Sequence, residues 1–199
     1  NLVMHYGLTE VSRAIFSSFH SDPYESLGHL GGATEVRVLD VNSNILENGL
    51  EGEIALCSSW MLSEYLDNPE LTKLSFADGY FKTGDLGIIN GEYLYLRGRL
   101  KEIINVGGKK VNPLDIESIL KRMSLVSDCA CVAFPDPQMG EVVKAFIVPS
   151  NEGIYSESEI KAYLQDKLPS HMRPRSYECV QGIPRTSNGK IQRLKLISK

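Results

Sequence analysis

The sequence lacks several features that would assign the protein to a special class. No apolar run approaches the ~20 residues of a membrane-spanning helix, and no secretory signal peptide opens the sequence. No C-x-x-C pair occurs, and no histidine stands at ligand spacing to a cysteine. These absences argue against a transmembrane segment and a zinc site. They favour a reduced, cytoplasmic protein whose four cysteines pack as small apolar residues: Cys57, Cys129, Cys131 and Cys179.

A strong charge of one sign is also missing, because the net charge is only −4. The two halves nevertheless differ. Residues 1–100 hold 6 basic and 14 acidic side chains, whereas residues 101–199 hold 15 and 11. The second half is too mildly basic to predict nucleic-acid binding. The split fits a basic lid that closes on an acidic body around an anionic ligand, and it fits ordinary solvated surfaces equally well.

The composition that remains is that of a folded protein. Of 199 residues, 42% are hydrophobic and 23% are charged, which predicts a globular chain of one large or two small domains. Residues 97–113 join a β-rich half to a smaller α+β half. This stretch carries five basic side chains and the pair Gly107-Gly108. We interpret it as a swivel, a segment at which the two halves can rotate, whose basic side chains can bind an anion. Because the chain starts at Asn1 inside what reads as a strand, we expect a piece of a longer protein.

Short strands and turns dominate the first half. Residues 35–40 and 51–57 read as strands, and Asn90-Gly91 predicts a hairpin between residues 87–89 and 93–96. We predict a helix over residues 60–66 that ends near Asn68-Pro69. The Asp78-Gly79 turn leads into a further strand, which we expect to end at Gly84-Asp85.

The second half alternates helices and strands. Pro113 predicts a helix start, and residues 128–134 and 142–149 read as strands. Ser156 and Glu159 form a capping-box pattern for a helix that runs to about Leu168. A strand near residues 177–180 and a polar loop at 182–191 follow. Helices packed on a small sheet are the expected form.

Two short segments carry candidate ligand-binding residues. Residues 6–10 read as a turn in which Gly7 permits close approach of a ligand, Tyr6 offers a flat face, Thr9 a hydroxyl and Glu10 an oxygen ligand suited to Mg²⁺. Asp85, beside a glycine, is suited to accept paired hydroxyls such as those of a ribose. The alternative interpretation of Glu10 and Asp85 is that each carboxylate only accepts hydrogen bonds from its own turn.

The loop at 182–191 ends in Gly189-Lys190 and superficially resembles a phosphate loop. The glycine spacing is wrong and Ile191 stands where Ser or Thr is required, so the P-loop pattern fails. A lysine on a polar, glycine-tipped loop remains, free to swing toward a carboxylate or phosphate oxygen. Taken alone, the loop is no more than an exposed turn.

The order of these segments changes that interpretation. Tyr-Gly-Leu-Thr-Glu at 6–10, Lys-Thr-Gly-Asp at 82–85, Gly-Arg-Leu-Lys at 98–101 with residues 107–113, and Pro-Arg-Thr-Ser-Asn-Gly-Lys at 184–190 together resemble the adenylate-forming superfamily. That superfamily comprises acyl-CoA synthetases, peptide-synthetase adenylation domains and firefly-type luciferases. The resemblance spans nearly the whole chain and implies the C-terminal portion of such an enzyme, with the N-terminal portion missing.

The resemblance also implies a fold and a domain division. The expected class is α+β, with a β-barrel-like end of the large AMP-binding domain over residues 1–98. A small, mobile α+β lid would follow over residues 99–199, with its hinge near Lys101.

Residue roles follow from the same resemblance. It implies that Tyr6 stacks on adenine with Gly7 beside it, that Thr9 lies near the α-phosphate, and that Glu10 holds Mg²⁺. Asp85 would take the ribose hydroxyls, and Arg99 the ribose or phosphate. Lys190 would be the adenylation lysine, and Gly107, Gly108 and Lys109 would border the channel for the coenzyme A thiol. The implied cofactors are ATP, Mg²⁺ and coenzyme A.

Some family features are absent or altered. Asn105 stands where many relatives carry a lysine, and the Ser/Thr/Gly-rich phosphate loop does not occur in this sequence, so we expect this piece alone to be inactive. The Ile-Ile-Asn-Val-Gly-Gly run at 103–108 looks more like an acyl-CoA synthetase than a peptide-synthetase domain. The expected activity is therefore ATP-dependent ligation of a carboxylic acid to coenzyme A. The alternatives are an enzyme that loads a carrier-protein thiol and a non-catalytic nucleotide-binding fragment.

Overall fold

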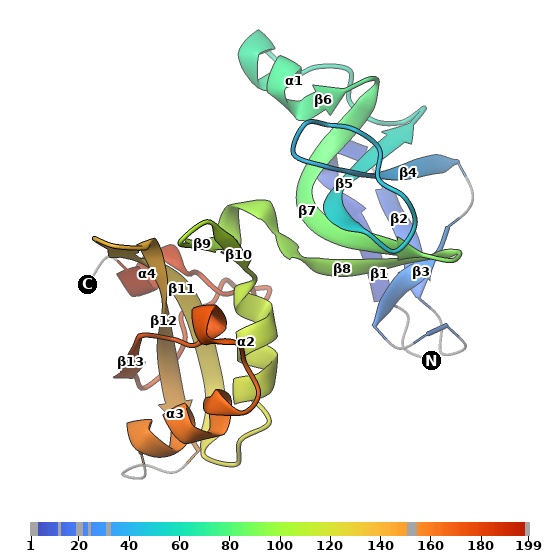
Figure 1. Cartoon of the computed structure of the whole chain (residues 1–199). Coiled ribbons are helices and arrows are strands. Elements are labelled where there is room, and N and C mark those ends of the chain that lie inside the picture. The colour runs from blue at the N-terminus through green and yellow to red at the C-terminus, as the bar shows by residue number, and fades with distance from the viewer. Residues whose placement is uncertain are drawn as a thin grey trace. The chain divides into compact units, whose positions relative to one another are not determined.

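The computed structural model describes residues 4–11, 13–18, 22–23, 25–30, 33–150 and 155–197. The chain divides into two compact units, Asn1–Lys101 (unit 1) and Glu102–Lys199 (unit 2). Both combine strands and helices, as Figure 1 shows, so the predicted α+β class is confirmed. The division falls at Lys101, the residue predicted as the hinge. Motion at this hinge stays a prediction. The domain roles expected of residues 1–98 and 99–199 also stay predictions.

Unit 1 is built on antiparallel β structure. Its larger sheet has the strand order β3-β8-β7-β5-β4, with β6 paired to β7, and β1 and β2 form a separate pair. The path from β3 to β4 does not close on itself among the described strands, so the barrel-like form stays a prediction. The strand bounds are β1 Met4–Leu8, β2 Arg13–Ser18, β3 Ser26–His29, β4 Thr34–Leu39, β5 Glu51–Ser58, β6 Phe76–Ala77, β7 Tyr80–Asn90 and β8 Tyr93–Arg99.

The core of unit 1 forms where alternating apolar residues of these strands face inward. Ile54, Leu56 and Leu94 are fully buried, and the Tyr6 ring packs in the same cluster. The hairpin predicted at Asn90-Gly91 is confirmed, because Asn90 pairs with Tyr93 across a two-residue loop. Gly91 takes a positive φ of 60° there, a conformation that glycine adopts without steric cost.

The helix predicted over residues 60–66 is wrong. The helix of this region is α1, Pro69–Ser75, which begins where the predicted helix was expected to end. Asn68 is its N-cap, and the Asn68 side-chain oxygen accepts a hydrogen bond from the Leu71 amide at 3.0 Å. Proline fits the first helical turn because its missing N–H has no intrahelical partner there. The Asn-Pro pair therefore starts a helix instead of stopping one.

The strand expected to end at Gly84-Asp85 continues through both residues as β7. The register with β5 shifts here, between Glu53 and Ala55, and Gly84 has a φ of +70°. A positive-φ glycine allows a bulge to bend a strand without ending it. Residues 6–10 are likewise not one turn, because Tyr6 and Gly7 belong to β1 and a short 3-10 helix covers Thr9–Val11.

Unit 2 contains a mixed sheet and, among the described residues, three α-helices. The strand order is β10-β9-β12-β11, and β13 pairs in parallel with β12. A cluster of buried side chains that includes Ile116, Ile147 and Ile160 joins the helices to the sheet. The bounds are a 3-10 helix Leu100–Glu102 at the boundary, β9 Ile104–Val106, β10 Lys109–Val111, α2 Pro113–Leu120, β11 Val126–Asp136, β12 Gly140–Pro149, α3 Glu157–Gln165, a 3-10 helix Ser170–Met172, β13 Ser176–Cys179 and α4 Leu194–Ile197.

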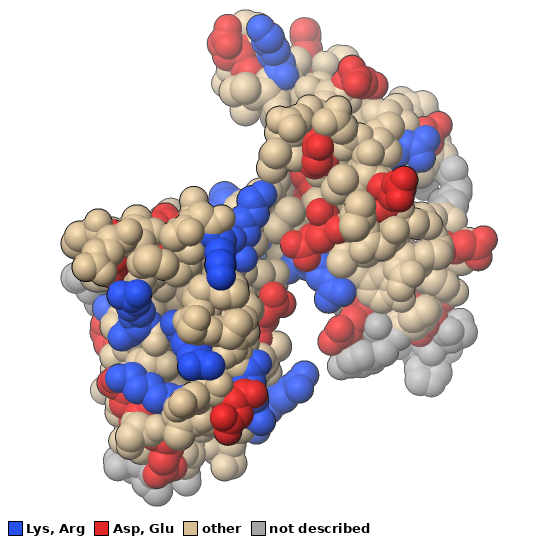
Figure 2. Space-filling view, in the orientation of Figure 1, with Lys and Arg blue, Asp and Glu red and all other residues tan. Residues whose placement is uncertain are grey.

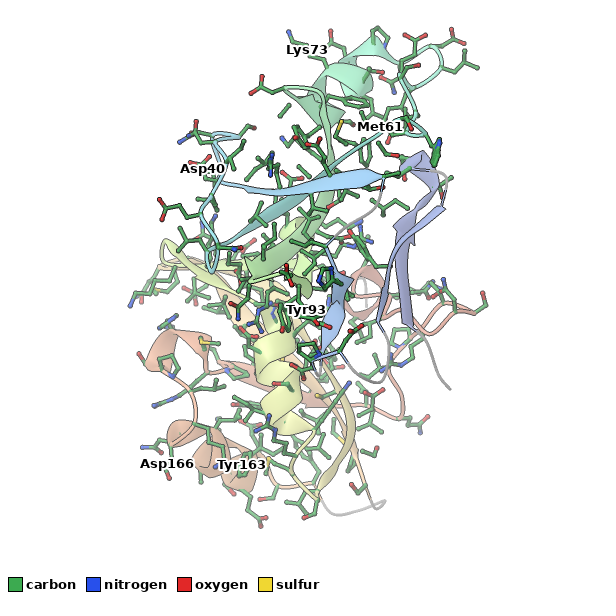
Figure 3. The ribbon with its side chains drawn as sticks, turned by 90° about the vertical axis from the view of Figure 1, so that its right-hand side faces the viewer. Asp40, Met61, Lys73, Tyr93, Tyr163 and Asp166 are labelled. Atoms are coloured by element: carbon green, nitrogen blue, oxygen red, sulfur yellow. The ribbon has the colours of Figure 1, made fainter. Side chains whose placement is uncertain are left out.

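The helix starts predicted in this half are confirmed. The Asn112 side chain caps α2 ahead of Pro113, and the Ser156 hydroxyl accepts from the Glu159 amide at 3.3 Å to cap α3. The helix α3 ends at Gln165, three residues before the expected Leu168; Tyr163 and Asp166 mark its C-terminal end in Figure 3. In the part of the chain that the structure describes, no helix is long and apolar enough to cross a membrane.

Candidate functional site

Unit 1 buries a carboxylate between a phenol and a guanidinium. Asp85 is 2% exposed. One of its oxygens accepts the Tyr6 hydroxyl at 2.7 Å, and the other pairs with the Arg99 Nε at 2.6 Å. Three residues that the sequence separates widely therefore meet on β1, β7 and β8. Burial, together with the negative charge of Asp85, raises the pKa of Tyr6 well above its ordinary value, so the phenol stays a hydrogen-bond donor.

The bulge in β7 sets the position of Asp85. The Thr83 hydroxyl donates to the Ile54 carbonyl at 2.7 Å and accepts from the Asp85 amide at 3.0 Å. The Gly84 amide donates to a Glu53 carboxylate oxygen at 3.0 Å. These bonds satisfy backbone groups that the bulge removes from the strand ladder, and they hold the aspartate in a fixed orientation.

The other residues predicted in the first motif lie next to this cluster in the chain. A register shift between Tyr6 and Gly7 interrupts the β1–β2 ladder, and Gly7 is exposed. Thr9 is exposed and Glu10 is half-buried in the short helix that follows. The Tyr65 hydroxyl donates to Glu10 Oε1 at 3.3 Å, so part of the carboxylate is already engaged within the protein.

In unit 2, Gly107 and Gly108 form the turn between β9 and β10. Their φ values are +56° and +84°, which suits the two central positions of a hairpin turn whose residues both need positive φ. Lys109 follows at the start of β10. A cavity of about 240 Å³ adjoins this turn, and its lining includes Gly107, Lys109, Met139, His171, Arg173 and Arg175. Figure 2 shows Lys and Arg side chains gathered over the visible face of unit 2.

Lys190 lies at the tip of a loop whose backbone is firmly tied. Thr186 and Lys190 are joined by a backbone hydrogen bond of 2.9 Å, and the Thr186 hydroxyl accepts from the Lys190 amide at 3.1 Å. Arg185 anchors the loop by pairing with Asp128 at 2.7 Å and donating to the Gly189 carbonyl at 2.9 Å. These bonds hold the backbone of the loop in place, whereas the movement expected of the Lys190 side chain stays a prediction. Lys190 is exposed, and no ion pair holds it among the described residues of its unit.

The residues present fit the groups that the resemblance implies. Asp85 is a carboxylate, and carboxylate oxygens accept hydrogen bonds from hydroxyl groups such as those of a diol. Mg²⁺ in phosphate-handling sites is commonly held by only one or two carboxylates together with substrate phosphates. A single half-buried Glu10 meets that requirement, and no larger group of acids, histidines and cysteines gathers among the described residues.

Comparison with known proteins identifies the family. Residues 115–190 match the family described as AMP-binding enzyme C-terminal domain. The chain is 36% identical over 194 residues to a long-chain-fatty-acid–CoA ligase, FadD13, of Mycobacterium tuberculosis, which covers 96% of this chain. The chain belongs to the adenylate-forming superfamily. It is also 34% identical over 199 residues to a 2-succinylbenzoate–CoA ligase of Listeria monocytogenes.

Solved structures of the superfamily share the fold. MatB of Rhodopseudomonas palustris, in an ATP-bound crystal structure, matches with a TM-score of 0.91 and 29% identity over 98% of this chain. An anthranilate–CoA ligase, AuaEII, in complex with anthranoyl-AMP, matches with a TM-score of 0.84 and 30% identity. This chain spans 38% of the length of the mycobacterial ligase and 40% of MatB, as expected for a C-terminal portion of an adenylate-forming enzyme.

Sequence reasoning missed one charged cluster in unit 2. Arg193, three residues after Lys190, is only 11% exposed and pairs with Glu117 and Glu102. The acids lie 76 and 91 residues away in the chain. The one available signal was the placement of Glu117 within the apolar stripe of α2, where an acid requires a buried partner.

Proposed function

We propose that the complete enzyme is an ATP-dependent acid–thiol ligase. It would activate a carboxylic acid as an acyl-adenylate and transfer the acyl group to coenzyme A. Within it, unit 1 would be the end of the large AMP-binding domain and unit 2 the lid. The present chain would be inactive alone, because the phosphate loop and most of the acyl pocket belong to the missing N-terminal portion.

The observation that carries the proposal is the buried Tyr6–Asp85–Arg99 cluster combined with an exposed, unpaired Lys190 on the second unit. A carboxylate held in a fixed orientation is suited to accept hydrogen bonds from the ribose hydroxyls of ATP. Arg99, which is 38% exposed beside it, is suited to a ribose or phosphate oxygen. Tyr6 and Gly7 would border the adenine and Thr9 the α-phosphate. Mg²⁺, held by Glu10, would neutralise phosphate charge.

Lys190 would supply the positive charge that the first half-reaction needs. When a carboxylate attacks the α-phosphate, two anions approach each other and negative charge builds up. A lysine ammonium is a compact point charge that can lie between such groups, and charge stabilisation of this kind is a large term in catalysis. The tied loop around Lys190 would present the ammonium at a defined place relative to unit 2.

The residues beside the Gly107-Gly108 turn favour a phosphorylated thiol. Lys109, Arg173 and Arg175 line the cavity next to the turn, and cationic side chains bind phosphate oxygens by charge-assisted hydrogen bonds. Coenzyme A carries such phosphates. A carrier-protein thiol is the alternative acceptor. A further solved relative is an amide bond synthetase, McbA, with a TM-score of 0.86, so the acceptor has to be measured.

Hydroxylamine trapping tests the first half-reaction. The complete enzyme is incubated with ATP, Mg²⁺, hydroxylamine and a panel of carboxylic acids, and hydroxamate is quantified. We expect product with one class of acid, and a loss of about 100-fold or more with Lys190→Ala, because the developing charge loses its partner. Lys195→Ala is the matched control, since Lys195 is an exposed lysine five residues further along that we place outside the site.

The same variants separate the two half-reactions. With acyl-adenylate and coenzyme A supplied directly, Lys190→Ala should retain most of the thioester formation. An equal loss in both steps would contradict the assigned role. Transfer to a carrier protein or an amine, but not to coenzyme A, would replace the proposed acceptor while leaving the adenylation chemistry in place.

A further inference from the structure

Arg193 connects three elements within unit 2. Its Nε donates to Glu102 Oε2 at 3.0 Å, on the short helix that contains the unit boundary. Its Nη1 donates to Glu117 Oε1 on α2 and, at 3.0 Å, to the Cys131 carbonyl on β11. Its Nη2 approaches Glu117 Oε2 at 3.4 Å. One side chain therefore joins the segment that bears Lys190 to the first residue after Lys101.

The cluster is too buried to be an ordinary surface ion pair. Arg193 is 11% exposed, Glu117 4% and Glu102 29%. Burial by itself lowers the pKa of Arg193, but Glu117 and Glu102 outweigh that effect and raise it, so the guanidinium stays charged. A planar guanidinium group that is hydrogen-bonded on two sides has little rotational freedom. Removing one partner would leave the other charge buried without compensation, which costs free energy of folding.

The loop of Lys190 is held at its other end as well. Arg185 fixes the start of the loop to Asp128 on β11, and the Gln192 amide donates to the Pro184 carbonyl at 2.8 Å. With both ends bonded to β11 or α2, Lys190 cannot move far unless unit 2 moves with it. The bond between Arg193 and Glu102 then links the Lys190 segment to the first residue of unit 2.

We infer that Arg193 is a positioning residue for adenylation. Through its bond to Glu102 it confines the swivel to Lys101 and holds the Lys190 segment in a fixed position relative to Glu102, the first residue of unit 2. This inference rests on the proposed function. It goes further because it names the internal connection that makes unit 2 turn as one body. If Glu102 were released, the flexible segment would extend into unit 2 and the reach of Lys190 would vary.

Glu102→Gln and Arg193→Lys in the complete enzyme test the role. The glutamine keeps the size of the side chain but removes its charge, and the lysine cannot bridge two acids as a fork does. We expect hydroxamate formation to fall about 10-fold to 100-fold, since misplacement by about 1 Å has effects of this size. Thioester formation from supplied acyl-adenylate should fall less than about 3-fold, because we assign Lys190 no part in that step.

The control is Glu178→Gln, which removes a carboxylate from a unit 2 ion pair, with Lys144 at 2.8 Å, that does not involve Arg193. It should leave both half-reactions unchanged. A second readout is independent of activity. Trypsin cleavage after Lys101 should be several-fold faster in Arg193→Lys than in wild type or the control, at temperatures at which thermal unfolding shows all three to be folded.

The outcomes distinguish the two levels of the proposal. The positioning role alone would be overturned if the wild type formed hydroxamate, both variants kept the wild-type ratio of half-reactions, and Arg193→Lys were cleaved at the wild-type rate. Equal losses in the two half-reactions that track a lower melting temperature would also overturn it, in favour of a purely structural role. No hydroxamate from the wild type with any acid would overturn the proposed function, and the positioning role with it.

Discussion

At the scale of single residues, the cysteines show how burial controls reactivity. Cys129 and Cys131 are fully buried on β11. Burial, assisted by the charge of Glu117, raises the pKa of Cys129 to about 12 and that of Cys131 well above its ordinary value. The thiolate is the reactive form, so both residues should be inert near neutral pH. The expectation that the cysteines pack as small apolar residues is confirmed for these two and is wrong for Cys179, which is exposed.

Alkylation of the complete enzyme with iodoacetamide at about pH 8 checks this expectation. Cys129 and Cys131 should react at least ~100-fold more slowly than Cys179, which is exposed on the same unit. All three should react at similar rates in concentrated urea, where burial no longer raises the pKa. Mass spectrometry of peptides gives the rates. Labelling of Cys129 in the folded protein as fast as Cys179 would contradict the buried assignment.

At the scale of elements, the close packing of β7 on β5 leaves no room for a side chain at Gly87. A Cβ added there would lie 2.6 Å from Ile54 Cδ1 and 2.8 Å from the Tyr95 carbonyl oxygen. Because Ile54 is fully buried and Tyr95 O is backbone, neither atom can move away cheaply. Gly87 is two residues from Asp85 on β7, so the same packing also supports the strand that carries the Tyr6–Asp85–Arg99 cluster.

Gly87→Ala should therefore lower the free energy of unfolding by about 2 kcal/mol, in the range seen for overpacked cores. Urea unfolding followed by circular dichroism measures the change. Gly182→Ala is the control, because a Cβ at Gly182 meets no atom within 4 Å and its φ is not positive; we expect a change within about 0.5 kcal/mol. Equal midpoints for the two variants would show that the sheet adjusts around position 87.

The elements that sequence analysis predicted are those fixed by local signals. The helix start at Pro113, the cap at Ser156 and the hairpin at Gly91 each depend on a few adjacent residues, and local patterns report such features well. The helix expected at 60–66 failed because an Asn-Pro pair was interpreted as a stop, although the cap geometry makes it a start. The bulge at Gly84 was missed because it depends on register with another strand.

The candidate site likewise has a part that the sequence predicts and a part that only the folded structure shows. The motifs located Asp85 and Lys190 through resemblance, since each lies in a short recognisable run. The partners of Asp85 and the Arg193 cluster depend on contacts between residues far apart in the chain. No periodicity or spacing encodes such contacts, so only the folded structure brings these residues together.

At the scale of the whole molecule, the two units have independent cores. Each has its own sheet and its own cluster of buried side chains, and the division falls between Lys101 and Glu102. Two bodies joined at one peptide can change their relation through very few backbone dihedrals, as hinges usually do. In the proposed function that change would serve both half-reactions, with Lys190 used in the first and the Gly107-Gly108 turn in the second.

Replacing Lys101 with Pro tests this use of the boundary. Proline fixes φ near −65° and restricts the preceding Leu100 as well, so the swivel would retain one range of orientations. In the complete enzyme, one half-reaction should keep a near-normal rate while the other falls at least about 10-fold, because only one arrangement stays accessible. Lys101→Ala is the control, since it removes the charge but leaves φ free, and it should change the ratio of the two rates little. If Lys101→Pro ran hydroxamate formation and thioester formation at wild-type rates, rotation at residue 101 would not be what connects the two steps.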